Sequence, residues 1–93
     1  MNYELIFRIK AEKDLEDIQD YYNKISPKIT DNFFVEFFET MDFIEDEPEL
    51  FQIRYRGIRI APLYRFPYGI HYRQTGKKII VYRVLHTKRY FKQ

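Results

Sequence analysis

The sequence predicts an α+β fold made of an N-terminal strand, a helical hairpin and then an antiparallel sheet of three or four strands. Apolar residues recur at spacings of three and four from Ala11 to Ile44, which is the period of amphipathic helices. The dipeptide Ser26-Pro27 divides that stretch in two. From Ile53 onwards, apolar and polar residues alternate, as they do in half-buried strands. We therefore expect the hairpin to pack on one face of the sheet.

The first strand and the first helix are predicted within residues 3–25. In the strand, Tyr3, Leu5, Phe7 and Ile9 share one parity, and the polar residues Glu4, Arg8 and Lys10 take the other, with Ile6 as the exception. The apolar face of the helix consists of Ala11, Leu15, Ile18, Tyr22 and Ile25. Acidic residues crowd its first half, where the positive end of the helix dipole stabilises them.

The second helix is predicted to begin at Ser26-Pro27. Serine is a good N-cap, and proline is tolerated at the first helical position because its missing N–H would have had no partner there. The apolar stripe that follows is Ile29, Phe33, Phe37, Met41 and Ile44. Pro48 is expected to end the helix.

Four strands are predicted after the hairpin, at Ile53–Tyr55, Ile58–Phe66, Gly69–Arg73 and Ile79–Leu85. The last of them is nearly continuous in apolar residues, which predicts a central strand covered on both faces. The turn before it contains Thr75-Gly76-Lys77-Lys78.

Length and composition indicate one small, complete, soluble domain over residues 1–93. A chain of this size is near the lower limit of independent stability, and the 9 Phe and 9 Tyr supply the large side chains that such a core needs. There is no cysteine, no secretory signal and no apolar run that could cross a membrane. We expect a cytoplasmic protein that has no membrane partner.

Charge is divided sharply between the two halves of the chain. Residues 1–51 carry 14 acidic and 5 basic side chains, whereas residues 52–93 carry 11 basic and no acidic ones. The small net charge of +2 therefore conceals a strongly dipolar molecule. We expect the basic half to be displayed on an exposed side of the sheet, where it would contact an anionic partner.

Few residue types suited to catalysis are present. The sequence has no cysteine nucleophile, and its only serine is the expected helix cap. His71 and His86 have no carboxylate in the same half of the chain to complete a metal site. We expect neither a metal nor a cofactor, a structural role for His71, and a strand-end position for His86.

Basic residues interleaved with aromatic ones are the remaining candidate for function. Arg59, Arg65, Arg73 and Arg83 alternate with Ile60, Tyr64, Tyr72 and Tyr82, and Lys88, Arg89, Tyr90 and Lys92 follow. Such a pattern suits phosphate contacts and base stacking, and it suits an acidic protein partner equally well. The alternative is that these arginines pair with carboxylates of the hairpin.

Three motifs together resemble toxins of the RelE/ParE superfamily, which belong to type II toxin–antitoxin modules. They are Ala11-x-x-Asp14-Leu15-x-x-Ile18-x-x-Tyr21-Tyr22, Arg65-Phe66-Pro67-Tyr68-x-Ile70-x-Tyr72 and Arg83-Val84-Leu85-His86-x-x-Arg89. The resemblance spans nearly the whole chain and implies the fold of that superfamily. It also implies a cognate antitoxin, which we expect to be acidic and to fold as it wraps the toxin. The sequence allows a homodimer without requiring one.

The resemblance leaves two activities open. RelE-like toxins cleave mRNA in the ribosome, and in that case His86, Arg89 and Tyr90 would be the catalytic residues. However, Gly69 stands where such enzymes usually carry a basic residue. The sequence looks more like the ParE branch, whose members poison DNA gyrase by binding. The residues expected to bind the target or the antitoxin are Arg59, Arg65, Arg73, Arg83, His86, Lys88 and Arg89. A third alternative is a basic binding module that is not toxic.

Overall fold

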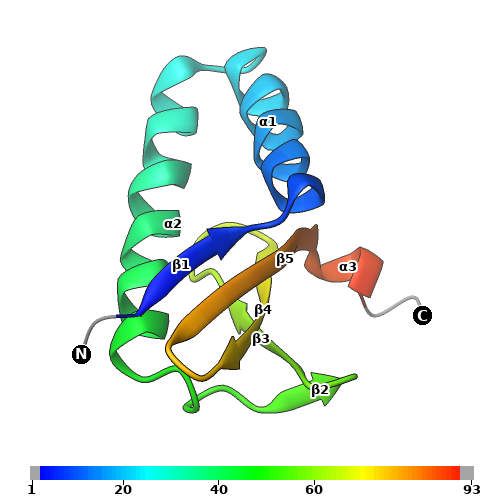
Figure 1. Ribbon diagram of the computed structural model, residues 1–93. Coiled ribbons are helices and arrows are strands. Elements are labelled where there is room, and N and C mark those ends of the chain that lie inside the picture. Colours follow the sequence, from blue (N-terminus) through cyan, green and yellow to red (C-terminus); the bar gives the residue numbers. More distant parts are fainter. Residues whose placement is uncertain (1–2, 91–93) are drawn as a thin grey trace.

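The computed structural model describes residues 3–90, and their side chains up to Lys88. The elements are β1 (Glu4–Phe7), α1 (Ile9–Asn23), α2 (Pro27–Asp46), β2 (Ile53–Tyr55), β3 (Ile58–Pro62), β4 (Tyr68–Thr75), β5 (Lys78–His86) and the short α3 (Thr87–Tyr90). This order confirms the predicted α+β architecture, with α1 and α2 side by side as a hairpin (Figure 1). The short α3 was not predicted.

The strands form one sheet in the order β1-β5-β4-β3-β2. Strands β2, β3, β4 and β5 pair antiparallel with one another, as predicted. The N-terminal strand β1 joins the same sheet by pairing parallel with β5, from Glu4 opposite Lys78 to Phe7 opposite Val81 (Figure 1). The last strand β5, which was predicted to be central, therefore has a strand on each side, although β4 is the middle strand of the five.

The core lies between the hairpin and one face of the sheet. From the helices it takes Ala11, Ile18, Phe33, Phe37, Met41 and Ile44, and from the sheet Ala61, Ile70, Tyr72, Ile79, Val81 and Val84. Tyr72 is fully buried, and its hydroxyl donates a hydrogen bond of 2.7 Å to the carbonyl oxygen of Pro48. Burial raises the pKa of Tyr72 to about 12, so this hydroxyl keeps its proton near neutral pH. Within residues 3–90, no helix is long and apolar enough to cross a membrane.

The start of α2 confirms the predicted cap. The Ser26 hydroxyl accepts a hydrogen bond of 3.2 Å from the backbone N–H of Lys28, and Pro27 is the first helical residue. Other boundaries differ from the prediction. Ile9 was predicted within the first strand but begins α1 and is 83% exposed, and Ile25 lies beyond the end of α1.

Strand β3 ends at Pro62, four residues earlier than predicted, and the chain then turns back into β4. Pro62 lies opposite Gly69 in the β3–β4 register. Beyond it, the backbone N–H of Leu63 donates 2.8 Å to the carbonyl oxygen of Tyr68. Proline cannot donate to a strand ladder, and the tight turn from Leu63 to Pro67 takes the residues that alternation alone had assigned to the strand.

The sheet face opposite the hairpin, called here the open face, carries both apolar and basic side chains. Partners across the strands project to the same side of a sheet, so His71 shares this face with Ile60 and Arg83. The prediction that β5 would be covered on both faces holds fully only for the face that packs against the hairpin. Half-buried Ile80 and Leu85 lie on its open side.

A β-bulge in β5 changes the side on which its residues lie. His71 pairs with Arg83 and Tyr72 pairs with Val81, which leaves Tyr82 as the extra residue. Val81 faces the core although Arg83, two residues later, faces the opposite side. Regular alternation would have placed Val81 and Arg83 on one face. The bulge brings Tyr82 and Arg83 to the same region of the molecule.

Candidate functional site

A groove of about 820 Å³ lies at one side of the open face, between the start of α1 and the β2–β3 turn. Five of its lining residues are basic: Arg8, Lys10, Arg56, Arg73 and Arg83. The others are apolar or aromatic: Phe7, Ile9, Tyr55, Ile58 and Tyr82. No carboxylate lines the groove among the described side chains. Its positive charge therefore favours an anionic ligand.

Tyr82 lines this groove and contacts two of its arginines. The guanidinium carbon of Arg8 is 5.3 Å from the centre of the Tyr82 ring, and that of Arg73 is 5.8 Å from it. Both distances fall within the range of cation–π attraction. The Arg73 guanidinium also donates a hydrogen bond to the backbone carbonyl oxygen of Arg56. These contacts hold the Arg73 side chain at the groove.

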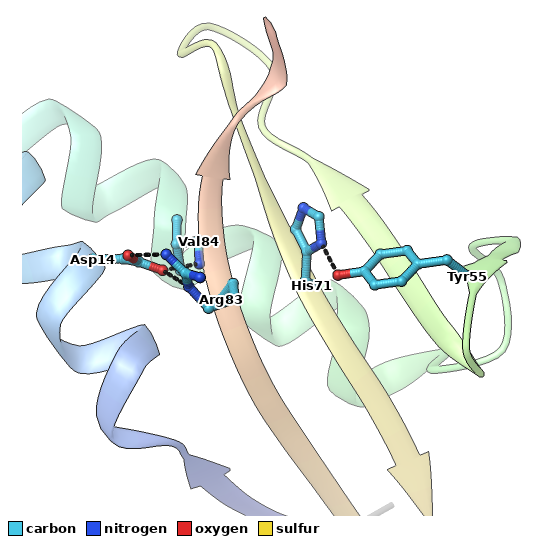
Figure 2. A network of polar contacts seen from close by, with 5 residues as sticks. All are labelled: Asp14, Tyr55, His71, Arg83 and Val84. Atoms are coloured by element: carbon cyan, nitrogen blue, oxygen red, sulfur yellow. Dashed lines mark hydrogen bonds and ion pairs between the residues drawn. The ribbon is translucent and has the colours of Figure 1, made fainter. Parts of the chain in front are cut away.

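Arg83 is the lining arginine that is tied to the hairpin. Its Nε and Nη2 donate 2.8 Å and 3.0 Å to the two carboxylate oxygens of Asp14 in α1. The same carboxylate accepts 2.9 Å from the backbone N–H of Val84 (Figure 2). Val84 lies past Val81, where β1 stops pairing with β5. Asp14 thus accepts a hydrogen bond from a β5 backbone N–H at a point where β1 no longer pairs with that strand. Its hydrogen bonding to Arg83 also raises the pKa of Arg83.

His71 and Tyr55 form the second polar contact of the open face. The two side chains share a hydrogen bond of 2.8 Å between the Tyr55 hydroxyl and His71 Nδ1 (Figure 2). His71 is 1% exposed. Burial, and secondarily the nearby charge of Arg83, lowers the pKa of His71 to about 4. The ring is therefore neutral at pH 7, in agreement with the structural role expected from the sequence.

A smaller, mostly apolar pocket of about 140 Å³ lies on the other side of His71. Its lining residues are Arg54, Ile60, Pro62, Gly69, His71, Leu85 and Thr87. Gly69 is required for close packing there, because a Cβ at this position would lie 2.9 Å from Cγ2 of Ile60. The pocket has the size of one apolar side chain of a partner.

The sequence-predicted arginines do not share one face. Arg73 and Arg83 line the groove, whereas Arg59 donates 2.6 Å to the carbonyl oxygen of Phe51 in the segment that follows α2. The backbone N–H of Arg65 donates 2.8 Å to the Glu36 carboxylate of α2. Arg59 and Arg65 thus lie toward the hairpin, away from the groove.

Among the described residues, Arg83 is the only one of these four arginines whose side chain pairs with a carboxylate. The alternative interpretation, in which these arginines pair with carboxylates of the hairpin, therefore applies to Arg83 and not to the other three in the described part of the chain. The remaining three contribute positive charge that the described carboxylates do not pair.

His86 and Lys88 also lie away from the groove. His86 is opposite Tyr68 in the β4–β5 register, and their rings are 5.3 Å apart. His86 Nδ1 accepts 3.1 Å from the backbone N–H of Lys88, as expected for a strand-end histidine. The side chains of Arg89 and Tyr90, also predicted as site residues, are outside the described part of the chain.

Sequence reasoning missed Arg8, Lys10 and Arg56 as groove residues. Arg8 and Lys10 belong to the acidic half of the sequence, so the charge division pointed away from them. They reach the groove because β1 pairs with β5, and the backbone N–H of Arg8 continues that pairing at 3.0 Å from the carbonyl oxygen of Val81. One signal in the sequence was available. Arg8 and Lys10 are two residues apart in the predicted first strand, so they would lie on the same side of it.

Comparisons with known proteins agree with the resemblance drawn from the motifs. The sequence matches a family described as the ParE toxin of the type II toxin-antitoxin system parDE over residues 5–91. A solved structure of the chromosomal ParDE TA system from P. aeruginosa is similar to this chain, with a TM-score of 0.78 and 25% sequence identity. That similarity covers 90% of this chain and 95% of the other. Comparison with curated proteins gives no match.

Proposed function

The chain belongs to the ParE toxin family of type II toxin–antitoxin systems, and we propose that it poisons DNA gyrase by binding and is neutralised by a cognate antitoxin. The observation that carries this proposal is the family match, which extends over residues 5–91.

The chemistry of the groove supports binding over catalysis. General acid–base catalysis needs a group that can exchange a proton near the operating pH and reach the reacting atoms. The described lining of the groove contains arginines, a lysine and tyrosines, but no carboxylate or histidine. The nearest histidine, His71, is buried and its pKa is lowered to about 4.

The competing function is ribosome-dependent cleavage of mRNA with His86, Arg89 and Tyr90 as catalytic residues. The position of His86 argues against it. His86 lies in a cavity of about 200 Å³ with Asp14, Asp17 and Tyr21 of α1. This cavity is on the hairpin side of the sheet, and His86 does not line the groove. Arg83 is the groove arginine that reaches the lining of this cavity, and its guanidinium is already bonded to Asp14.

The open face supports an antitoxin that is acidic and folds on binding. The basic groove and the apolar pocket lie next to each other, on either side of the Tyr55–His71 pair. An extended acidic segment could place carboxylates in the groove and one apolar side chain in the pocket. Segments that fold on binding cover large surfaces in this way.

The test uses the purified chain with DNA gyrase and, in parallel, with translating ribosomes. We expect loss of supercoiling and accumulation of gyrase-cleaved DNA, with mRNA left intact. Co-expression of the neighbouring open reading frame, as the candidate antitoxin, should restore growth. Arg73→Gln should weaken gyrase inhibition more than Lys78→Gln, which removes an exposed charge outside the groove.

Cleavage of mRNA in the ribosome, abolished by His86→Ala or Arg89→Ala, would replace this proposal with the nuclease alternative. If the chain inhibits neither gyrase nor translation, the non-toxic basic module is the better description.

A further inference from the structure

We propose that the basic groove binds nucleotides, holding the phosphate on its arginines and the base against its aromatic and guanidinium groups. The ligand class is a nucleotide unit, either within a single strand of nucleic acid or free in solution. This inference goes beyond gyrase poisoning, because the binding requires no second protein.

The charge of the groove is concentrated and incompletely neutralised. Its five basic residues come from four separated parts of the chain, namely residues 8–10, 56, 73 and 83. Asp14 offsets the charge of Arg83. The other four basic residues have no ion pair with a described carboxylate. The guanidinium carbons of Arg8 and Arg73 lie 5.3 Å and 5.8 Å from the centre of the same ring, so they are within about 11 Å of each other. Arginines gathered in this way suit the oxygens of neighbouring phosphates.

The aromatic residues of the groove favour a ligand that has flat rings. Tyr82 and Tyr55 both line it, and Tyr82 already stacks with guanidinium groups. Arg8 is exposed, so a base can stack on the side of its guanidinium that faces away from Tyr82. Proteins that bind single strands combine a positive groove with such stacking groups. The carboxylates of an acidic peptide can pair with the arginines, but they have no flat ring that could stack on the guanidinium and aromatic groups.

The size of the groove also fits. About 820 Å³ lies within the range of small-ligand sites, which is roughly 300–1,000 Å³. The apolar pocket lies on the other side of the Tyr55–His71 pair, so a strand that passes this pair could continue from the bound nucleotide to the pocket.

The experiment is fluorescence anisotropy of the purified chain with a labelled single-stranded oligodeoxynucleotide of about eight nucleotides, a length within the usual site sizes. The test variant is Arg8→Gln/Arg73→Gln. Its matched control is Lys77→Gln/Lys78→Gln, which removes the same charge from two exposed residues outside the groove, one in the β4–β5 turn and one at the start of β5. We expect the groove variant to weaken binding at least tenfold more than the control. Its salt dependence, the slope of log K against log salt concentration, should fall by about 1.4, or about 0.7 for each lost phosphate contact.

Stacking is tested with Tyr82→Leu, for which we expect at least fivefold weaker binding. Tyr64→Leu is the control, because Tyr64 is 91% exposed and does not line the groove. Thermal unfolding of every variant confirms that it is folded. If Arg73→Gln prevents folding, Arg8→Gln/Lys10→Gln tests the same groove from two exposed positions.

Competition by ATP and by inorganic triphosphate separates the two sources of the ligand. Displacement of the oligonucleotide by ATP at far lower concentration than by triphosphate indicates a site for one free nucleotide. Displacement by a longer strand alone indicates a nucleic-acid site. The proposal is overturned if the two double variants weaken binding equally, since overall charge would then explain the affinity. It is also overturned if an oligoglutamate binds and the oligonucleotide does not. Either failure leaves gyrase inhibition to be judged by its own assay.

Discussion

Replacing Asp14 by alanine should destabilise the fold strongly, because one carboxylate serves two buried or half-buried groups of β5. The Asp14 side chain is 12% exposed and the Arg83 side chain 33% exposed. The substitution removes two charge-assisted hydrogen bonds to Arg83 and one to the backbone N–H of Val84, which is a 2% exposed residue. Hydrogen bonds to charged groups contribute about 1.5–3 kcal/mol, and a buried N–H left unsatisfied costs about 1–3 kcal/mol.

Water can replace part of the lost contact, because a third of the Arg83 side chain remains exposed. We therefore count the two bonds to Arg83 as a single charge-assisted bond of about 1.5–3 kcal/mol, which together with the unsatisfied N–H gives a range of about 2.5–6 kcal/mol. We expect a loss near the lower end of that range, about 3 kcal/mol. In a domain of this length, that corresponds to a fall in Tm of about 12–24 °C. Asp14→Asn should cost less, since its amide oxygen can still accept from Val84.

The assay is urea unfolding near neutral pH, followed by circular dichroism, with Asp17→Ala as the control. Asp17 is on the same helix, but its side chain is 61% exposed and pairs with Lys13 at 3.3 Å. Exposed pairs of this kind contribute about 0–1 kcal/mol. If Asp14→Ala and Asp17→Ala differ by less than about 0.5 kcal/mol, Asp14 does not act as a buried link between α1 and β5.

Three further predictions concern His71, Tyr72 and Gly57. The pKa of His71 is lowered to about 4 in the folded chain, so its contribution to stability is complete above about pH 6.5 and is lost as the pH falls toward 4. Urea unfolding should show a loss of about 2 kcal/mol by about pH 5 that His71→Gln removes and His86→Gln does not. Tyr72→Phe leaves the Pro48 carbonyl oxygen without its donor, and chemical unfolding should register a cost of about 1–2 kcal/mol. Gly57→Ala should cost about 1–2 kcal/mol in thermal unfolding, because Gly57 has a φ of +76° and the new Cβ would lie 3.2 Å from Nη2 of Arg73.

Each of these predictions has a result that would contradict it. A stability profile of His71→Gln parallel to that of the parent chain would mean that another group titrates. Tyr72→Phe without effect would mean that water reaches Pro48. For Gly57, the control is Gly76→Ala, which has a φ of +60° and no heavy atom within 4 Å of the added Cβ. Equal costs at both glycines would mean that Arg73 moves away freely.

The order of the elements could be predicted because its signals are local. The Ser26-Pro27 cap, the helical spacing of the apolar residues and the change to alternation after Phe51 each depend on neighbours a few residues apart. The same local reasoning failed at Ile9. Its side chain continues the alternation of the first strand, but the chain turns at Arg8, which precedes the first helical residue.

The groove could be predicted only in part, because long-range pairing and the bulge assemble it. Asp14 and Arg83 are 69 residues apart, and the sequence gives no sign of which carboxylate meets which arginine. The bulge at Tyr82 breaks the alternation from which the faces of Arg83 and Tyr82 were assigned. Alternation also grouped Arg59 with Arg73. In the structure, Arg59 lies opposite the core residue Tyr72 and therefore on the other face of the sheet.

The parallel pairing of β1 with β5 has a consequence for synthesis. Residues 4–7 are translated more than seventy residues before their partners, residues 78–81. In the same way, Arg8 and Lys10 can form the groove with Tyr82 and Arg83 only after those two residues have been translated. A nascent chain that lacks β5 therefore has no assembled groove. Harmful activity that depends on this groove would begin only after β5 has been translated, which gives a pre-existing inhibitor time to be in place.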